Sequence, residues 1–321
     1  MPLRLEALPR HHARAEAVNP IPAPPQTPLH WGAEALWAQL EPRLPGLSVE
    51  VVERIASTNS ALLERARNVG EVREEGSIAQ VRRSVESGAF GRRSADMQPC
   101  LLVAEHQTHG RGRHGRSWQA APGASLTFSL ALPLAPSDWS GLSLAVGVAL
   151  ADALDPSRDG ATARIGVKWP NDLWMQDSDG GGRKLGGILI ETVSAGARRL
   201  AVIGVGLNVL PLTTPDASSG FACLQELDAQ ASAPQVLAQV AAPLLDALLQ
   251  FERDGFAPFA LRFAARDLLR ERHVRTTQRD AAEGVAIGVS ASGALLVRTA
   301  DGVRAVTSGE VSVRLDPSAP C

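Results

Sequence analysis

Lysine is nearly absent from this sequence. Among the 32 basic residues in a chain of 321, only Lys168 and Lys184 are lysines, and the others are arginines. The guanidinium group of arginine is a planar fork, whereas the ammonium group of lysine is a compact and strongly hydrated point charge. Because the chain uses arginine almost everywhere else, we infer that its two lysines stand where a compact ammonium group is needed and a planar guanidinium group would not fit.

Cysteine and long hydrophobic runs are also scarce. The three cysteines, Cys100, Cys223 and Cys321, are odd in number and lack the spacing of metal ligands, which indicates reduced thiols and predicts a cytoplasmic location. The most apolar segment, 142–154, contains Asp152 and is too short to span a bilayer, so we predict a buried helix and no membrane association. The net charge of −2 means that any basic character must be local.

The hydrophobic pattern predicts an α/β (α+β) unit followed by a small β unit. Residues 1–45 are predicted to form an N-terminal arm, which is disordered up to about residue 29, where Pro, Ala, Arg and His are abundant, and holds one short helix within 31–44. Residues 46–270 contain both strand and helix patterns, and residues 271–321 contain short alternating strands typical of a small β-barrel. Residues 69–98 lack a strong pattern and are predicted to be a surface insertion.

The individual elements can be placed from periodicity. Strands of the large unit are predicted at 47–55, 100–105, 124–132, 164–169, 173–176, 184–192 and 199–209. Helices are predicted at 61–67, 142–154, 233–252 and 257–269, with a short one inside 31–44. The strands of the small unit are predicted at 274–277, 284–289, 294–298, 303–307 and 310–314.

The most unusual stretch is Gly110–Trp118, which reads Gly-Arg-Gly-Arg-His-Gly-Arg-Ser-Trp. Glycines at this density permit positive φ angles and close approach of a ligand, and arginines supply bidentate donors suited to phosphate or carboxylate. The stretch matches the G-x-G-x-x-G fingerprint and nearly matches a P-loop, but both motifs require a helix directly after the loop. A strand pattern at 124–132 follows instead, so neither site is predicted.

Other short motifs carry polar side chains at the ends of predicted strands. Ser57-Thr58-Asn59-Ser60 can cap a helix and also face a ligand. A Pro-Asn-Asp turn occupies 170–172, Lys184 opens a strand with a Gly-Gly pair, and a Gly-x-Gly-x-Asn sequence ends at Asn208. This set supplies positive charge but no obvious nucleophile or metal-ligand cluster. It suits a reaction in which the substrate attacks a phosphate while the protein supplies position and charge.

In this order and at these separations, the motifs at 110–118, 168–173, 184–191 and 204–208 resemble those of the biotin protein ligases, also called biotin–[acetyl-CoA-carboxylase] ligases. The resemblance implies a class II aminoacyl-tRNA synthetase-like catalytic domain with a mixed sheet and a C-terminal SH3-like barrel. It also implies that biotin and ATP, with Mg²⁺, are joined to biotinyl-5′-AMP with release of pyrophosphate. Biotin then passes to one lysine of the biotin carboxyl carrier protein of acetyl-CoA carboxylase.

The resemblance also implies roles for individual residues. The residues expected to bind biotin or the acyl-adenylate are Ser57, Thr58, Asn59, Gln107, Gly110, Arg111, Gly112, Arg113, Lys184, Gly187 and Gly206. The residues expected to contact the nucleotide are Arg116, Trp118, Lys168, Asn171, Asp172 and Asn208. In catalysis, Lys184 is expected to donate to the biotin carboxylate and the α-phosphate, and Arg113 and Arg116 are expected to face the phosphates. No residue is expected to ligate a metal directly, because Mg²⁺ arrives with ATP.

The sequence departs from some family members, which carry an N-terminal winged helix-turn-helix. No such pattern precedes residue 46, so we expect no sequence-specific nucleic-acid binding. The resemblance leaves open whether two subunits form a homodimer. Two alternative functions are a lipoate- or octanoate-protein ligase on the same fold and a non-catalytic, adenylate-binding regulator. The dense Arg/Gly loop followed by Trp118 favours biotin over a fatty acid, and the two lysines together with the loop arginines favour catalysis.

Overall fold

A computed structural model describes residues 29–67, 97–156, 163–178, 181–195, 198–212, 220–307 and 314–315. Residues 1–28 of the arm expected at 1–45, and nearly all of the insertion expected at 69–98, lie outside these ranges. Within them, no helix has both the length and the apolar character needed to cross a membrane.

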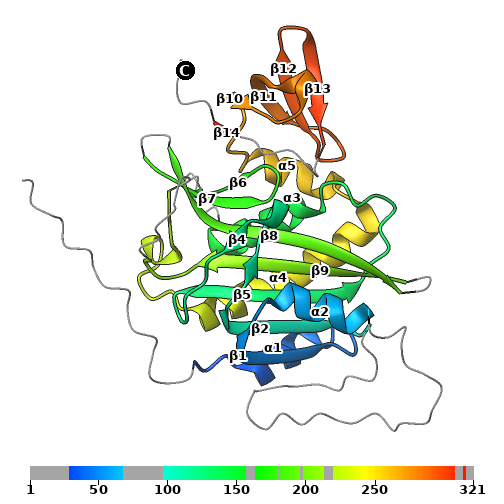
Figure 1. Ribbon diagram of the computed structural model, residues 1–321, viewed down its shortest axis with the longest axis vertical. Coiled ribbons are helices and arrows are strands. Elements are labelled where there is room, and N and C mark those ends of the chain that lie inside the picture. Colours follow the sequence, from blue (N-terminus) through cyan, green and yellow to red (C-terminus); the bar gives the residue numbers. More distant parts are fainter. Residues whose placement is uncertain are drawn as a thin grey trace, which may run out of the picture.

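Seven strands form the central sheet, in the order β1-β2-β5-β9-β8-β7-β6 (Figure 1). Their bounds are β1 (Ser48–Ile55), β2 (Cys100–Gln107), β5 (Ser125–Pro133), β6 (Ile165–Lys168), β7 (Asp172–Gln176), β8 (Gly182–Ala195) and β9 (Arg198–Asn208). β1 and β2 are parallel, and the other neighbouring pairs are antiparallel. The mixed α/β fold is therefore confirmed, and the strand patterns located each of these strands to within a few residues.

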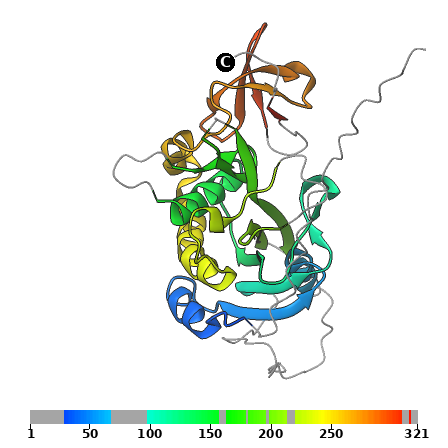
Figure 2. The same ribbon diagram turned by 90° about the vertical axis from the view of Figure 1, so that its left-hand side faces the viewer.

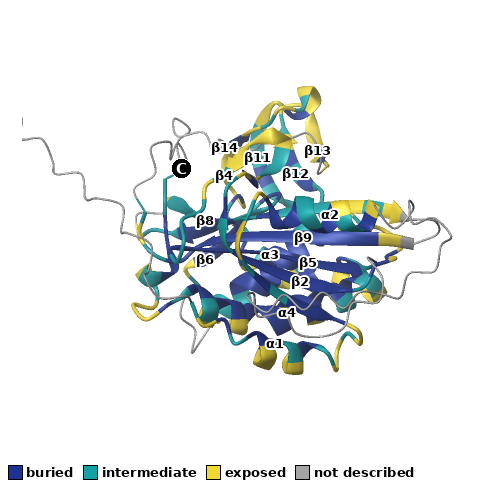
Figure 3. Cartoon of the chain, turned by 60° about the horizontal axis from the view of Figure 1, so that its bottom comes forward, coloured by how far each residue is buried: buried dark blue, intermediate teal, exposed yellow. Residues whose placement is uncertain are grey.

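Helices cover both faces of the sheet. α1 (Ala33–Leu40), α3 (Leu142–Leu154) and α4 (Ala233–Asp254) lie on one face, and α2 (Thr58–Arg67) lies on the other (Figure 2). α3 is apolar on nearly all sides because it is packed between the sheet and α4. The strands and the inward faces of these helices make the main hydrophobic core (Figure 3), and a smaller core lies beneath α2.

The short helix near the N-terminus belongs to the main core, which differs from the arm expected at 1–45. Leu36 and Leu40 of α1 are 3% and 1% exposed, and Trp31 before it is also buried. The indole N–H of Trp37 donates to the carbonyl oxygen of Leu47 at 2.9 Å, which fixes α1 at the start of β1. The sequence predicted a helix here but grouped it with the arm, whereas its apolar side chains pack in the main core beneath the sheet.

The predicted helix at 257–269 is shorter in the structure. A 3-10 turn, η4 (Ala257–Phe259), leads into α5 (Ala260–Ala264), and the chain then pairs with β6 through a bridge between Val167 and Asp267. Arg266 explains the early end of the helix: its buried guanidinium donates to the Ile165 carbonyl oxygen at 2.7 Å and pairs with Asp152 at 2.5 Å. These bonds hold the chain extended against the sheet.

A second, antiparallel sheet follows, with strand order β13-β12-β11-β10-β14. Its strands are β10 (His273–Arg275), β11 (Glu283–Val289), β12 (Leu295–Thr299), β13 (Gly302–Val306) and β14 (Arg314–Leu315), with a 3-10 turn, η5 (Arg279–Ala281), before β11. This sheet contacts the main unit near the turn that follows β6, where the buried indole N–H of Trp169 donates to the Gly293 carbonyl oxygen at 3.0 Å.

Candidate active site

A cleft of about 390 Å³ lies where the α2 N-terminus, the Arg/Gly stretch and the turn after β6 meet. Its floor is formed by residues of β5, β8 and β9. Because these strands are neighbours in the middle of the sheet, segments more than 100 positions apart in the sequence face one cavity. The cleft therefore collects most of the motifs that the sequence singled out.

The Arg/Gly stretch forms a small hairpin that covers the cleft. β3 (Gly110–Arg111) pairs with β4 (Ser117–Trp118), and a 3-10 turn, η2 (Arg113–Gly115), joins them. Gly110 is required because a Cβ there would collide with the carbonyl oxygen of Trp118. The tip of the hairpin uses left-handed backbone at His114 (φ 56°) and Gly115 (φ 72°), which a glycine adopts without strain. No helix follows, in agreement with the exclusion of a P-loop.

Trp118 packs directly on the backbone of β9. A Cβ at Gly206 would lie 2.5 Å from Cε2 of the Trp118 ring, so the absence of a side chain at Gly206 makes room for the indole. The Trp118 N–H is buried and makes no hydrogen bond to the residues that the structure describes. It faces the backbone of β9 at Gly206, where it would lie 2.8 Å from an added Cβ.

One end of the cleft is uncharged and rich in hydrogen-bonding groups. Oε1 of Gln107 accepts from the backbone N–H of Thr58 at 2.7 Å and from the Thr58 hydroxyl at 3.1 Å. Ser57 caps α2, since its hydroxyl accepts from the N–H of Ser60. Within the described residues, the Nε2 group of Gln107 has no partner and can donate to a small polar ligand.

Asn59 is fully engaged inside the protein. Its Nδ2 group donates to the carbonyl oxygen of Leu189 at 3.1 Å and to Oε2 of Glu191 at 3.0 Å, and its Oδ1 accepts from the hydroxyl of Ser129 at 2.6 Å. A Cβ at Gly204 would collide with this side chain. Asn59 lines the cleft, but these bonds make it a support for the cleft wall.

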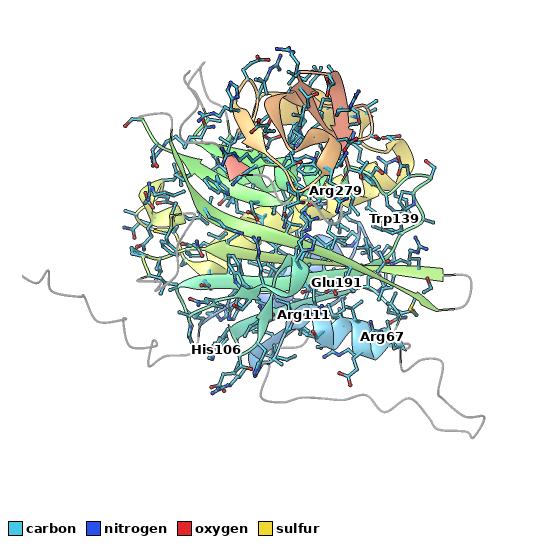
Figure 4. All side chains as sticks on the ribbon, turned by 45° about the horizontal axis from the view of Figure 1, so that its top comes forward. Arg67, His106, Arg111, Trp139, Glu191 and Arg279 are labelled. Carbon is cyan, nitrogen blue, oxygen red and sulfur yellow. The ribbon has the colours of Figure 1, made fainter. Side chains whose placement is uncertain are left out.

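Glu191, which the sequence analysis did not single out as a site residue, connects this wall to the hairpin. Its carboxylate accepts from Nη2 of Arg111 at 2.9 Å and from Nη1 at 3.1 Å, and Figure 4 shows the two side chains next to each other. Arg111 also donates to the Ser60 hydroxyl at 3.3 Å. The guanidinium of Arg111 is thus held by protein groups at the rim of the cleft.

The opposite end of the cleft is cationic. Nζ of Lys184 lies 2.9 Å from Oδ1 of Asp172. Nη1 of Arg113 donates to Oδ1 of Asn171 at 3.2 Å, and Nδ2 of Asn171 donates to the carbonyl oxygen of Ile188 at 2.8 Å. The side chains of Lys184 and Arg113 are therefore each held in position by a residue at the turn between β6 and β7.

Electrostatics at this end favour an anionic ligand. Burial lowers the pKa of the Arg113 guanidinium, Asp172 opposes this shift, and the neighbouring charge of Arg116 adds to it. Arg113 remains charged at neutral pH because an arginine titrates far above it. A partly desolvated cation next to a second cation gains from a bound phosphate, which would neutralise both.

Lys168 and Gly187 complete the cationic end. Nζ of Lys168 lies 4.0 Å from the centre of the Trp174 ring, a cation–π arrangement. A Cβ at Gly187 would lie 3.6 Å from Nζ of Lys184 and 3.4 Å from Oδ1 of Asp172. Glycine at this position keeps the space beside the ammonium group open for a ligand.

The structure brings together most of the predicted site residues. Those that line the cleft are Ser57, Thr58, Asn59, Gln107, Arg111, Gly112, Arg113, Arg116, Trp118, Lys168, Asn171, Asp172, Lys184, Gly187 and Gly206. Gly110 lies in the covering hairpin outside this lining. Asn208 is buried, and its Nδ2 group donates to the carbonyl oxygens of Lys184 and Ala222 at 3.2 and 3.0 Å, so it supports the backbone of Lys184.

Several lining residues were missed by sequence reasoning. They are His114, Ser117, Phe128, Trp169, Pro170, Trp174, Ile188, Leu189, Gly204 and Val205. Trp169 and Pro170 are adjacent to the recognised turn, and their peptide bond is cis. The apolar members belong to ordinary strand patterns, in which no feature distinguishes a cleft-lining side chain from a core one.

The arrangement supplies charge and orientation rather than a nucleophile. Among the described residues that line the cleft, no serine or cysteine is hydrogen-bonded to a histidine. The described part of the chain also contains no cluster of three His, Cys, Asp or Glu that could hold a metal. Such a site can bind two substrates side by side and stabilise negative charge that develops between them.

Comparison with known proteins relates both sheets to one family. Residues 91–208 match the family described as Biotin/lipoate A/B protein ligase family, and residues 271–314 match Biotin protein ligase C terminal domain. The Bifunctional ligase/repressor BirA of Escherichia coli (strain K12) is 33% identical over 282 residues, covering 86% of this chain and 77% of that protein. The Biotin--[acetyl-CoA-carboxylase] ligase of Paracoccus denitrificans is 31% identical over 226 residues, covering 65% of this chain and 88% of that protein.

The fold is also found among solved structures. The structure described as Biotin protein ligase from Aquifex aeolicus in complex with biotin and ATP has a TM-score of 0.60 against this chain. The two are 24% identical, and the match covers 84% of this chain and 99% of that one. This likeness establishes a shared fold.

Proposed function

The chain belongs to the biotin protein ligases, and we propose that its cleft joins biotin to ATP and then passes biotin to a lysine of a carrier protein. The carrier is the biotin carboxyl carrier protein of acetyl-CoA carboxylase, which the name of the Paracoccus denitrificans relative implies. The enzyme is thus a ligase, with biotin and ATP as substrates. Mg²⁺ enters as part of the Mg-ATP substrate.

Biotin binds at the uncharged end of the cleft. The free Nε2 group of Gln107 and the hydroxyls of Ser57 and Thr58 suit the urea group of biotin, which both donates and accepts hydrogen bonds. A fatty acyl chain has no polar atom to accept from the Nε2 group of Gln107, and leaving this group without a partner would weaken its binding. This polar end therefore favours biotin over octanoate or lipoate.

Activation takes place at the cationic end. An oxygen of the biotin carboxylate attacks the α-phosphorus of ATP, the bond to the bridging oxygen breaks, and pyrophosphate leaves with the electron pair. Lys184 holds the carboxylate and the α-phosphate together, and Asp172, at 2.9 Å, keeps its ammonium group in position. Arg113 and Arg116 stabilise the negative charge on the phosphates as it moves to the leaving group.

Transfer completes the reaction. The carrier's lysine amine attacks the carbonyl carbon of biotinyl-5′-AMP, an amide bond forms, AMP leaves with the electrons of the broken anhydride bond, and the nitrogen gives up a proton to solvent. Trp118 packs on Gly206 and closes one side of the cleft. The covering hairpin protects the anhydride from water until the carrier arrives.

The proposal also covers the domain architecture of the chain, its oligomeric state and its location in the cell. The main unit is a class II aminoacyl-tRNA synthetase-like domain, and the C-terminal sheet is an SH3-like barrel, which its five antiparallel strands support. The separate strand order of that sheet supports a boundary between residues 270 and 271, and the packing of α1 in the main core extends the main unit to residues before 46. A homodimer and a cytoplasmic location remain predictions from the sequence.

The observation that carries the proposal is the division of one cleft into a neutral polar end and a cationic end around Lys184. The test is release of pyrophosphate from the purified protein with Mg-ATP and biotin, octanoate or lipoate, before any carrier is added. We expect release with biotin alone. Release with the fatty acids would reassign the chain to the lipoate branch, and no release with any of the three would favour the regulator.

A further inference from the structure

Glu191 of β8 connects two segments that are distant in the sequence. Its carboxylate accepts a bidentate pair of hydrogen bonds from Arg111 of the covering hairpin, at 2.9 and 3.1 Å. It also accepts from Nδ2 of Asn59, at the start of α2, at 3.0 Å. A single side chain on a central strand thus fastens the hairpin to the wall of the cleft.

The hairpin is also attached at its tip, where Nη1 of Arg113 donates to Oδ1 of Asn171 at 3.2 Å. Its two short strands pair with each other through two residues each, so their hydrogen bonds give no attachment to the central sheet. On its base side, Trp118 packs against the backbone of Gly206. At its rim, the Arg111–Glu191 pair is supported by one longer bond, 3.3 Å, to Ser60. Lifting the rim from the sheet therefore requires that the bidentate pair break.

The pair is placed for local control of the hairpin rather than for global stability. The side chains of Arg111 and Glu191 are 45% and 24% exposed. Partly exposed ion pairs contribute little to the free energy of unfolding, because both groups are well solvated when they separate. Bidentate geometry, in contrast, fixes the relative orientation of the two segments that it joins.

We propose that Glu191 is a positioning residue that acts through Arg111 to latch the Arg/Gly hairpin over the cleft and so retain the acyl-adenylate. The proposal rests on the proposed function in one respect, the identity of the retained intermediate. With the latch intact, the anhydride waits in a closed cleft for the carrier's lysine. Without it, the hairpin opens more often and the adenylate escapes into water.

The decisive variant is Glu191→Gln, because glutamine still accepts from Asn59 but loses the charge that holds both arms of Arg111. Glu50→Gln is a matched control: Glu50 lies on β1, accepts from Nη1 of Arg65 of α2 at 2.9 Å, and does not line the cleft. In both variants, trypsin cleavage after Arg113 and Arg116 is measured without ligands, and dissociation of radiolabelled biotinyl-5′-AMP is measured from the preloaded enzyme.

We expect Glu191→Gln to raise both rates about threefold, the ratio that corresponds to ~0.7 kcal/mol, with no comparable change for Glu50→Gln. Pyrophosphate release under single-turnover conditions and the midpoint of thermal unfolding should stay close to wild type. In trypsin cleavage of the hairpin, Arg111→Lys should resemble Glu191→Gln, and the double variant should be cleaved no faster than either, because the two residues act as one unit.

Contrary outcomes separate the two proposals. Equal cleavage and dissociation rates in wild type and Glu191→Gln would overturn the latch, whatever the enzyme activates. A fall in thermal midpoint that accounts for faster cleavage would also overturn it, since the role would then be structural. A wild-type protein that forms no biotinyl-5′-AMP, but in which Glu191→Gln still accelerates trypsin cleavage, would retain the latch and overturn the proposed function.

Discussion

At the scale of single residues, Lys184 owes its position to Asp172, 2.9 Å away. Replacing Lys184 by alanine removes the donor that meets the developing charge and leaves the Asp172 carboxylate without this cation beside the phosphates. We expect biotin-dependent pyrophosphate release to fall by ~10²-fold or more, the scale for one lost donor to developing charge. The measurement is the single-turnover rate at saturating Mg-ATP, with thermal unfolding as the check on folding.

A partial rescue gives the matching control for Lys184. In the double variant Lys184→Ala/Asp172→Asn, the repulsive carboxylate is removed as well, so part of the lost binding of ATP should return while the rate remains low. If Lys184→Ala alone releases pyrophosphate within about threefold of the wild-type rate, Lys184 does not stabilise the developing charge as proposed.

The sequence indicated Lys184 and Arg113 because each stands in an unusual local pattern. Lys184 is one of two lysines in a chain of arginines, and Arg113 belongs to a stretch dense in glycine. Glu191 closes the motif at 184–191, but nothing in that motif gives the glutamate a role, since a glutamate near the end of a strand is ordinary. Its role depends on Arg111, which lies 80 positions away, and only the paired strands bring the two together. Long-range partners of this kind are not recorded in local patterns.

At the scale of elements, β9 shows why glycines interrupt a buried strand. Gly206 leaves space for the Trp118 ring, whose Cε2 would lie 2.5 Å from an added Cβ. We expect Gly206→Ala to lower the free energy of unfolding by about 1–3 kcal/mol, because overpacking forces the ring and the hairpin to shift. Urea unfolding followed by tryptophan fluorescence measures the change.

The control for Gly206→Ala is an alanine substitution at Gly112, a glycine of the hairpin where an added Cβ has space. At Gly112 an added Cβ would lie 3.4 Å from the Arg116 carbonyl oxygen, an ordinary contact, and the backbone has φ −119°. Gly112→Ala should therefore change the free energy of unfolding far less than Gly206→Ala. Equal losses in the two variants would show that the Trp118 contact is not the cause.

The bounds of helices and strands were predicted correctly where the hydrophobic periodicity was regular. They were predicted wrongly where hydrogen bonds and ion pairs to distant residues end an element early. The apolar helix at 142–154 was located with its bounds, because a helix covered on both sides carries a continuous apolar signal. The helix predicted at 257–269 ended at Ala264, because the bonds of Arg266 to β6 and Asp152 replace further helical turns. The role of α1 in the core could not be read from a composition that resembles a disordered arm.

At the scale of the whole molecule, Asp267 lies in the segment that joins the main unit to the C-terminal sheet. Burial raises the pKa of its carboxyl group to about 6 from 3.8, while hydrogen bonding from Leu269 and the charge of Arg270 oppose the rise. The folded chain therefore binds a proton more tightly than the unfolded chain between these values. This contribution to stability is present at low pH and is lost as the pH rises through about 6.

The variant Asp267→Asn should remove this pH dependence. Above pH 6 the wild type carries a buried charge that the variant lacks, so we expect the variant to be more stable there by about 1–3 kcal/mol. Near pH 4 the wild-type carboxyl is protonated in the folded state and the difference should shrink. Urea unfolding at pH 4.5 and pH 7.5 gives the two values, and a difference that does not vary with pH would refute the account.

The place of β9 in the sheet sets the order in which the molecule can be completed during synthesis. β1, β2 and β5 form one half of the sheet and β6, β7 and β8 form the other, and β9 is the strand that pairs with both halves. Gln107 and Thr58 belong to the first half, whereas Lys184 and Asp172 belong to the second. A growing chain on the ribosome therefore carries two separate half-sites until residue 208 has emerged, and only then can its neutral and cationic ends form one cleft.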